Sequence, residues 1–343
     1  MENERIKNVI KSLTLDEKLS LCGLSLSLVS EQIAKKRIFS VDLGAKEFYS
    51  PPTFFAAGCT FDTEIMYHAG KSAAGFASEN GIAVNGVINL GVIRNPMTDG
   101  AETMLSEDPI AVKRLADAFI NGAGGRVFAR GYAGGESGFE NRFYDARAMR
   151  EIYLLPLERL GKKLGGVFLP YGAFNGSLCV ESKNFINRIK EFLRPDVPII
   201  APAGSVRDAV TSADSGAAVT VGSSESAKAR IKSAVENGTL HESKLDAALV
   251  RLISFTAEYY ESKKSENVSR VKTYDSEKSL AEKSIVLLKN NGILPLDKRA
   301  KLSVCGEDGR ADCLARLFDI SAGKCTEKGK TNIIAAVFEN GEL

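Results

Sequence analysis

The stretch from Asp196 to Asp208 constrains the fold of this chain more than any other. Residues 197–201 are a short apolar run between a helix-like segment and a turn that contains Pro202 and Gly204. Such a run is typical of a strand buried on both faces of a parallel α/β sheet. Functional groups of such sheets lie on the loops that leave the carboxyl ends of the strands. Here the loop 202–205 has no carboxylate, histidine or thiol, so this strand end lacks an obvious catalytic group.

Strand-like and helix-like segments alternate along the first 260 residues. Strands are predicted over 38–44, 84–90, 127–129, 166–171, 197–201 and 217–221, with helices between them. This alternation predicts an α/β fold with a TIM-like β/α barrel, complete or incomplete, over residues 1–260. Residues 261–275 are polar and predict a linker. Residues 276–343 predict a truncated piece of an α/β sandwich, with strands at 302–305 and 333–338 and a helix near 311–318.

Several helix starts can be placed by their capping residues. Thr14 and Glu17 have the spacing of a capping box, in which each side chain bonds the backbone of the other residue. Asp62, Asp108 and Asp145 each precede an apolar-periodic segment and are predicted N-caps. The helix after Asp62 is rich in glycine and alanine, so we expect it to lie close to a sheet.

Composition excludes several classes of function. Lys+Arg total 45 and Asp+Glu 43, so no overall charge favours nucleic acid or an anionic membrane. No apolar run approaches the roughly 20 residues that span a bilayer. Six cysteines are scattered without a C-x-x-C pair, which favours reduced thiols in the cytoplasm. With only two histidines, no metal site is expected. The glycine-rich loop 130–138 lacks the spacing of a phosphate-binding loop, so no cofactor is expected either.

Five stretches in chain order resemble motifs of one enzyme family. They are L-T-L-D-E-K-L at 13–19, R-N-P at 94–96 with S-E-D-P at 106–109, D-A-R-A-M-R-E-I-Y-L at 145–154, Tyr171 with N-G at 175–176, and S-I-V-L-L-K-N at 284–290 with L-P-L at 294–296. Together they resemble glycoside hydrolase family 3, the β-glucosidase and β-N-acetylhexosaminidase family. The resemblance implies a barrel followed by an α/β sandwich, and an ancestral activity on β-glycosides.

The differences from this family lie at its catalytic positions. The family's nucleophilic aspartate corresponds to Pro202, which has no nucleophilic atom. Retaining hydrolysis needs that carboxylate about 5 Å from a second one. The family's K-H-F triplet corresponds to residues 130–132, which keep a cation and lose the histidine, and its G-R-x-x-E corresponds to 99–103 without the arginine or the glutamate. The resemblance therefore implies a non-hydrolytic relative, a pseudoenzyme.

The remaining polar residues near the predicted strand ends are candidates to bind a sugar or polyol. They are Asp42, Arg94, Arg130, Tyr132 and Tyr171. An alternative is an active glycosidase with relocated carboxylates, for which Asp42, Glu136 and Asp208 are the candidates. Each candidate also has a structural interpretation; Asp208, for example, can cap the helix after the strand at 197–201.

The tail of the chain predicts assembly. Residues 333–338 are apolar and uncharged, and a two- or three-stranded unit buries little surface by itself. Unpaired strand edges associate readily with other strands. We therefore expect this segment to pack against the barrel, against a second copy in a homodimer, or against a partner chain that completes the second domain.

Overall fold

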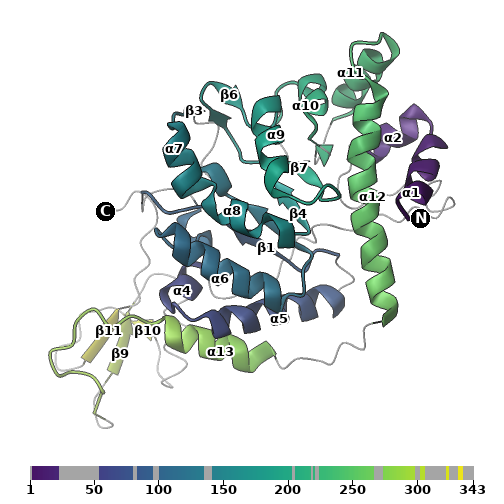
Figure 1. The fold of residues 1–343 in the computed structure, drawn as a ribbon. Coiled ribbons are helices and arrows are strands. Elements are labelled where there is room, and N and C mark those ends of the chain that lie inside the picture. The colour runs from purple at the N-terminus through teal and green to yellow at the C-terminus, as the bar shows by residue number, and fades with distance from the viewer. Residues whose placement is uncertain are drawn as a thin grey trace. The chain divides into compact units, whose positions relative to one another are not determined.

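A computed structural model describes residues 2–22, 54–79, 83–95, 100–134, 141–202, 205–217, 219–220, 224–265, 273–297, 302–305, 322–323 and 331–334. Its contacts divide the chain into a first unit, Met1–Ile285, and a second unit, Val286–Leu343. Helices and strands of the first unit follow one another along the chain (Figure 1). No helix within the described ranges is long and apolar enough to cross a membrane.

A parallel sheet forms the centre of the first unit. Its strands are β1 (Gly86–Asn89), β2 (Val127–Arg130), β4 (Gly166–Phe168), β7 (Ile199–Ala201) and β8 (Val219–Thr220), paired in the order β1-β2-β4-β7-β8. Each strand pairs in parallel with its neighbour. All three residues of β7 are buried, as expected for a strand covered on both faces. The α/β class with a parallel sheet is therefore confirmed for the described strands, each of which lies inside or within one residue of its predicted range. The strand predicted at 38–44 lies outside the described residues.

Helices connect these strands and cover the sheet. They are α1 (Glu2–Lys11), α2 (Leu15–Cys22), α4 (Phe54–Cys59), α5 (Thr63–Glu79), α6 (Pro109–Gly122), α7 (Ala146–Ala148), α8 (Leu155–Leu160), α9 (Lys183–Phe192), α10 (Ala209–Ser215), α11 (Glu225–Glu236), α12 (Glu242–Ser265) and α13 (Thr273–Ser284). Asp62 accepts hydrogen bonds from the amides of Glu64 and Ile65, so its predicted cap is confirmed. The predicted caps at Asp108 and Asp145 are confirmed as well.

The helices α5 and α6 approach each other closely through glycine. A Cβ on Gly70 would lie 2.1 Å from the carbonyl oxygen of Phe119, and one on Gly122 would lie 1.9 Å from that of Tyr67. Only hydrogen fits at either position. The close approach at Gly70 is therefore to the helix α6 and not, as the sequence had led us to expect, to a sheet. Phe119 itself is buried and contacts Phe54 edge to face at a ring-centroid distance of 5.5 Å.

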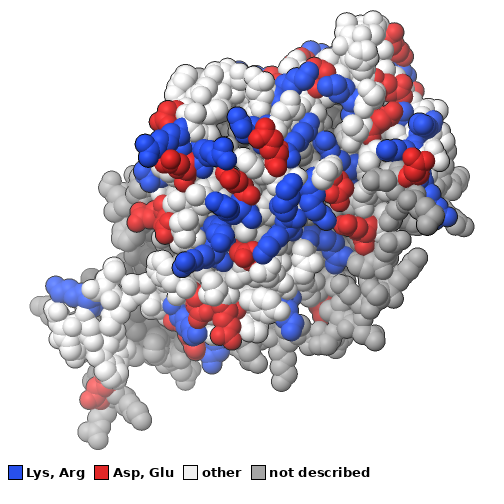
Figure 2. Space-filling view, in the orientation of Figure 1, with Lys and Arg blue, Asp and Glu red and all other residues white. Residues whose placement is uncertain are grey.

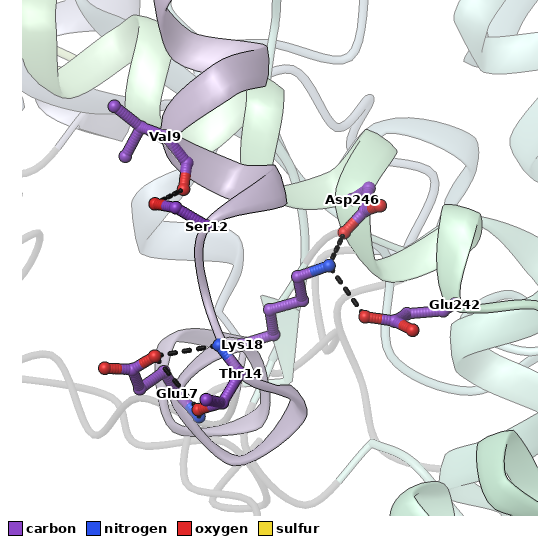
Figure 3. Close-up of polar contacts among 7 residues, drawn as sticks. All are labelled: Val9, Ser12, Thr14, Glu17, Lys18, Glu242 and Asp246. Atoms are coloured by element: carbon purple, nitrogen blue, oxygen red, sulfur yellow. Dashed lines mark hydrogen bonds and ion pairs between the residues drawn. The ribbon is translucent and has the colours of Figure 1, made fainter.

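A buried lysine joins the N-terminal helices to α12. The Lys18 Nζ lies 2.7 Å from Glu242 Oε1 and 2.6 Å from Asp246 Oδ1, and Figure 3 shows it pointing between the two carboxylates. Burial opposes the charge of Lys18, but the hydrogen bonds to Asp246 and Glu242 outweigh it, so the pKa of Lys18 is raised. The neighbouring capping box forms as predicted, with Glu17 Oε2 accepting from the Thr14 amide at 2.8 Å.

The boundary between the units differs from the predicted linker. The helix α12 continues to Ser265, into the range 261–275, and α13 contacts α4 and α5 of the first unit. The division lies between Ile285 and Val286, not at residue 275. A polar composition does not exclude a helix, because glutamate and lysine are good helix formers.

The second unit contains a small parallel sheet. Its strands are β9 (Leu302–Cys305), β10 (Ala322–Gly323) and β11 (Thr331–Ile334), paired in the order β10-β9-β11. The predicted strand at 302–305 is confirmed, and β11 covers the first residues of the one predicted at 333–338. Residues 335–338 and the helix predicted near 311–318 lie outside the described residues.

Candidate functional site

Three of the predicted positions lie on neighbouring strands of the sheet. Arg130 ends β2, Tyr171 is the third residue after β4, and Pro202 directly follows β7. The strands β2, β4 and β7 are consecutive in the sheet and parallel. Their carboxyl ends therefore meet at one edge, where parallel α/β folds place their functional groups.

Arg130 and Tyr171 form the polar part of this edge. The Arg130 side chain is exposed, and Tyr171 is 40% exposed. Burial raises the pKa of the Tyr171 phenol, while the positive charge of Arg130 lowers it by a smaller amount. The pairing of β2 with β4 places both residues at the same edge of the sheet. A cation beside a phenol can hold a hydroxyl-rich or anionic ligand through hydrogen bonds.

Pro202, which the motif resemblance aligns with the family's nucleophile, has no polar side-chain atom and contributes its backbone carbonyl. Its carbonyl oxygen accepts hydrogen bonds from the Ser205 hydroxyl at 2.7 Å and from the Ser205 amide at 3.2 Å. Ser205 is buried, so this turn is fixed from inside the fold. Among the described residues that directly follow β1, β2, β4 and β7, none carries a carboxylate.

Glu181 is a residue that the sequence did not single out. Its Oε1 accepts hydrogen bonds from the amides of Arg207 and Asp208, both at 2.7 Å. One carboxylate oxygen thus holds the segment between β7 and α10. Glu181 follows the short strand β6 (Ser177–Leu178) and belongs to no motif, so no pattern in the sequence points to this contact.

Asp208, a candidate relocated carboxylate, has a structural role here. It caps α10 by accepting from the Thr211 amide and hydroxyl, and its Oδ1 lies 2.7 Å from Arg230 Nη2. The hydrogen bond from the Thr211 side chain lowers the pKa of Asp208, and the charge of Arg230 adds to this effect. A carboxylate held ionised in this way is a poor proton donor.

Tyr132, an expected ligand-lining residue, lies in the hydrophobic core instead. It belongs to the 3-10 turn η2 (Tyr132–Gly134) and its exposed fraction is 0%. Its hydroxyl makes no hydrogen bond with any residue that the structure describes. Burial, together with the nearby Cys179 thiol, raises the pKa of Tyr132 well above its ordinary value. The phenol therefore packs as an apolar ring, and in this conformation it presents no surface to a ligand.

The segment just before Arg94 lies beside Ser106, the first residue of the S-E-D-P motif. Val92 pairs with Ser106 in an isolated bridge, and the Ile93 amide donates to the Ser106 carbonyl at 3.1 Å. Arg94 follows this bridge with an exposed side chain. Nearby, the buried Asn89 ends β1, accepting from the Gly91 amide and donating to Thr103 Oγ1, both at 2.8 Å. These contacts hold the segment that follows β1 against the residues around Thr103 and Ser106.

The other candidate carboxylates, Asp42 and Glu136, lie outside the described residues. Within the described part of the chain, no three His, Cys, Asp or Glu side chains are grouped as ligands for a metal ion.

Comparison with known proteins identifies relatives among β-glucosidases. No family model matches the sequence. The thermostable β-glucosidase B of Acetivibrio thermocellus is 27% identical over 341 residues, which cover 88% of this chain and 44% of the relative. The β-glucosidase of Rhizobium radiobacter is 26% identical over 207 residues, covering 54% of this chain and 25% of the relative. The chain thus spans less than half the length of these relatives.

Solved structures show the same likeness in fold. A Kluyveromyces marxianus β-glucosidase superposes with a TM-score of 0.76 at 21% identity, covering 90% of this chain and 41% of that one. The Bifidobacterium adolescentis family 3 β-glucosidase gives a TM-score of 0.74 at 19% identity, covering 95% of this chain and 52% of that one. The chain therefore resembles the glycoside hydrolase family 3 β-glucosidases in sequence and shares the fold of about half of their structures.

Proposed function

We propose that this protein is a non-hydrolytic relative of the family 3 glycosidases that binds a sugar or polyol at the carboxyl edge of its sheet. The observation that carries this proposal is Pro202 directly after β7. It lies on the same edge of the sheet as Tyr171, which follows the neighbouring strand β4, and Arg130, which ends β2. The side chains for contacting a ligand are present there, whereas the atom that would attack a glycoside is not.

The chemistry of glycoside hydrolysis supports this choice. A retaining enzyme needs a carboxylate nucleophile and a second carboxyl group about 5 Å away, and an inverting enzyme needs two carboxyl groups about 6.5–9.5 Å apart. The strand ends described here offer a guanidinium and a phenol. Asp208 is engaged as a helix cap and in an ion pair with Arg230. The lost nucleophile therefore has no evident substitute among the described groups.

A second candidate is an active glycosidase that uses Asp42 or Glu136. Its support is the sequence likeness to β-glucosidases, which covers most of this chain. It includes the case in which a second copy or a partner chain supplies part of the site. We also propose that the sheet belongs to a TIM-like barrel. Because Cys22, Cys59 and Cys179 are free thiols, we further propose that the protein is cytoplasmic.

Two measurements test the proposal. We expect hydrolysis of aryl β-glucosides and β-N-acetylglucosaminides at background rates. We also expect calorimetric binding of glucose or isofagomine, the ligands of the neighbours from Thermotoga neapolitana and Listeria innocua. Arg130→Gln and Tyr171→Phe should each weaken binding about tenfold, whereas the matched control Arg188→Gln, on the exposed face of α9, should leave it unchanged.

Turnover would contradict the proposal if it survives Pro202→Ala and is lost in Asp42→Asn or Glu136→Gln. That outcome establishes the second candidate. Absence of both turnover and binding would contradict the assignment of a sugar or polyol ligand. Pro202→Asp alone should restore little activity, because no second carboxyl group lies on the described strand ends.

A further inference from the structure

Two helices on the outside of the sheet, α9 and α12, each bring a lysine to the end of a third, α10. The helix α10 contacts both α9 and α12, and it ends at Gly216, whose φ is 93°. The Lys190 ammonium lies only 2.5 Å from the point that a Cβ on Gly216 would occupy. From α12, Lys244 Nζ donates to the Asp214 carbonyl at 3.0 Å and lies 3.3 Å from its Oδ1. Two ammonium groups from different helices therefore meet at the last turn of α10.

Two further cations act on the same place. Arg251 projects from α12, and its Nε donates to the Pro195 carbonyl at 3.2 Å. Lys183 begins α9 and is exposed. Burial, and then the positive charges of Arg251, Lys244 and Lys183, lower the pKa of Lys190 to about 8. The charges of three other side chains thus act on one half-buried ammonium, which remains protonated at a pH of about 7.

Around the last turn of α10, the positive charges of these side chains outnumber the negative ones. Asp214 is the carboxylate that pairs with Lys244, whereas the Lys190 ammonium makes no hydrogen bond or ion pair with any residue in the described part of the chain. The carbonyl end of α10 favours nearby cations, but a helix end carries only about half an elementary charge. Figure 2 shows Lys and Arg side chains gathered at the centre of the face on which α8, α9 and α12 lie.

We propose that Lys190, Lys244 and Arg251, with Lys183 at the rim, form a binding site for a phosphate group. Phosphate carries enough charge to balance the surplus and accepts several hydrogen bonds at once. A small anion can reach a half-buried ammonium, whereas a flat polyanion would contact only the exposed rim. The site lies among helices and not at the strand ends, so it is independent of the sugar site proposed above.

The test uses the full chain and inorganic phosphate. The melting temperature and calorimetric binding are followed against phosphate at constant ionic strength, with chloride as the replacement anion. We expect saturable binding by the wild type and at least about tenfold weaker binding by Lys190→Gln. The matched control is Lys71→Gln, which removes the same charge from an exposed position on α5 and should bind as the wild type does.

Two further experiments identify the ligand and exclude a folding defect in the variant as the cause of lost binding. Lys190→Arg keeps the positive charge and should retain most of the binding, and without phosphate Lys190→Gln should melt at or above the wild-type temperature. Glucose 6-phosphate, tested in an Arg130→Gln background to exclude the strand ends, distinguishes a phosphorylated metabolite from free phosphate. Tighter binding than phosphate assigns the former, and equal binding the latter. If phosphate has no more effect than chloride, or if Lys190→Gln binds as tightly as Lys71→Gln, the proposal is wrong.

Discussion

Replacing Tyr132 with phenylalanine should make the protein more stable. The Tyr132 ring is completely buried, and its hydroxyl has no hydrogen-bond partner among the described residues. Leaving a buried hydroxyl unpaired costs about 1–3 kcal/mol, whereas phenylalanine fills nearly the same volume without that cost. Because η2 can relax around the ring, we take the lower end and expect a gain of about 1 kcal/mol in the free energy of unfolding, or about 2–4 °C in melting temperature.

Urea unfolding followed by far-ultraviolet circular dichroism measures this change, and Tyr67→Phe is the control. Tyr67 is 42% exposed on α5, so removing its hydroxyl should change stability by less than about 0.5 kcal/mol. A loss of about 1 kcal/mol or more in Tyr132→Phe would refute the reasoning, since it would show that the hydroxyl has a partner in solution. In that case Tyr132 would again be a candidate for ligand contact.

Three other changes test the packing and charges described above. Lys18→Met should lower the free energy of unfolding by about 2 kcal/mol in urea, less than for a fully buried pair because its two carboxylate partners are partly exposed; an unchanged midpoint would show that the pairs contribute nothing. Gly122→Ala should lower the melting temperature by several degrees in a thermal scan, because the new Cβ meets the Tyr67 carbonyl; an unchanged value would mean that α5 and α6 separate at no cost. Raising the pH from about 8 to about 10 should stabilise the wild type relative to Lys190→Gln by about 1 kcal/mol, because the folded chain releases the Lys190 proton first and the unfolded chain then binds more protons. A constant or reversed difference in urea titrations at those pH values would contradict the lowered pKa.

Local sequence patterns were sufficient where the interaction itself is local. The buried strand at β7 follows from its apolar run, and the caps at Asp62, Asp108 and Asp145 follow from residue type and position. The order of the strands then brings Arg130 and Tyr171 to the same edge. To predict these features, it is enough to know the residue pattern of a buried strand and the residue types that cap a helix.

Features that depend on distant packing were not predictable in the same way. Tyr132 directly follows a strand end, and residue type alone does not tell whether its ring turns toward a ligand or into the core. Glu181 reaches amides 26 and 27 residues away, which no motif encodes. The contacts of Lys190 depend on how α9, α10 and α12 pack together.

The segment after β7 is held in place without any help from the side chain at position 202. Ser205 closes the turn through the carbonyl of Pro202, an atom that every amino acid supplies, and Glu181 holds the amides that follow. Folding of this loop therefore depends on the backbone of residue 202, whereas catalysis would depend on its side chain. Selection could remove the nucleophile without disturbing the scaffold, and a designer could exchange residue 202 to install new chemistry on a backbone that is already fixed.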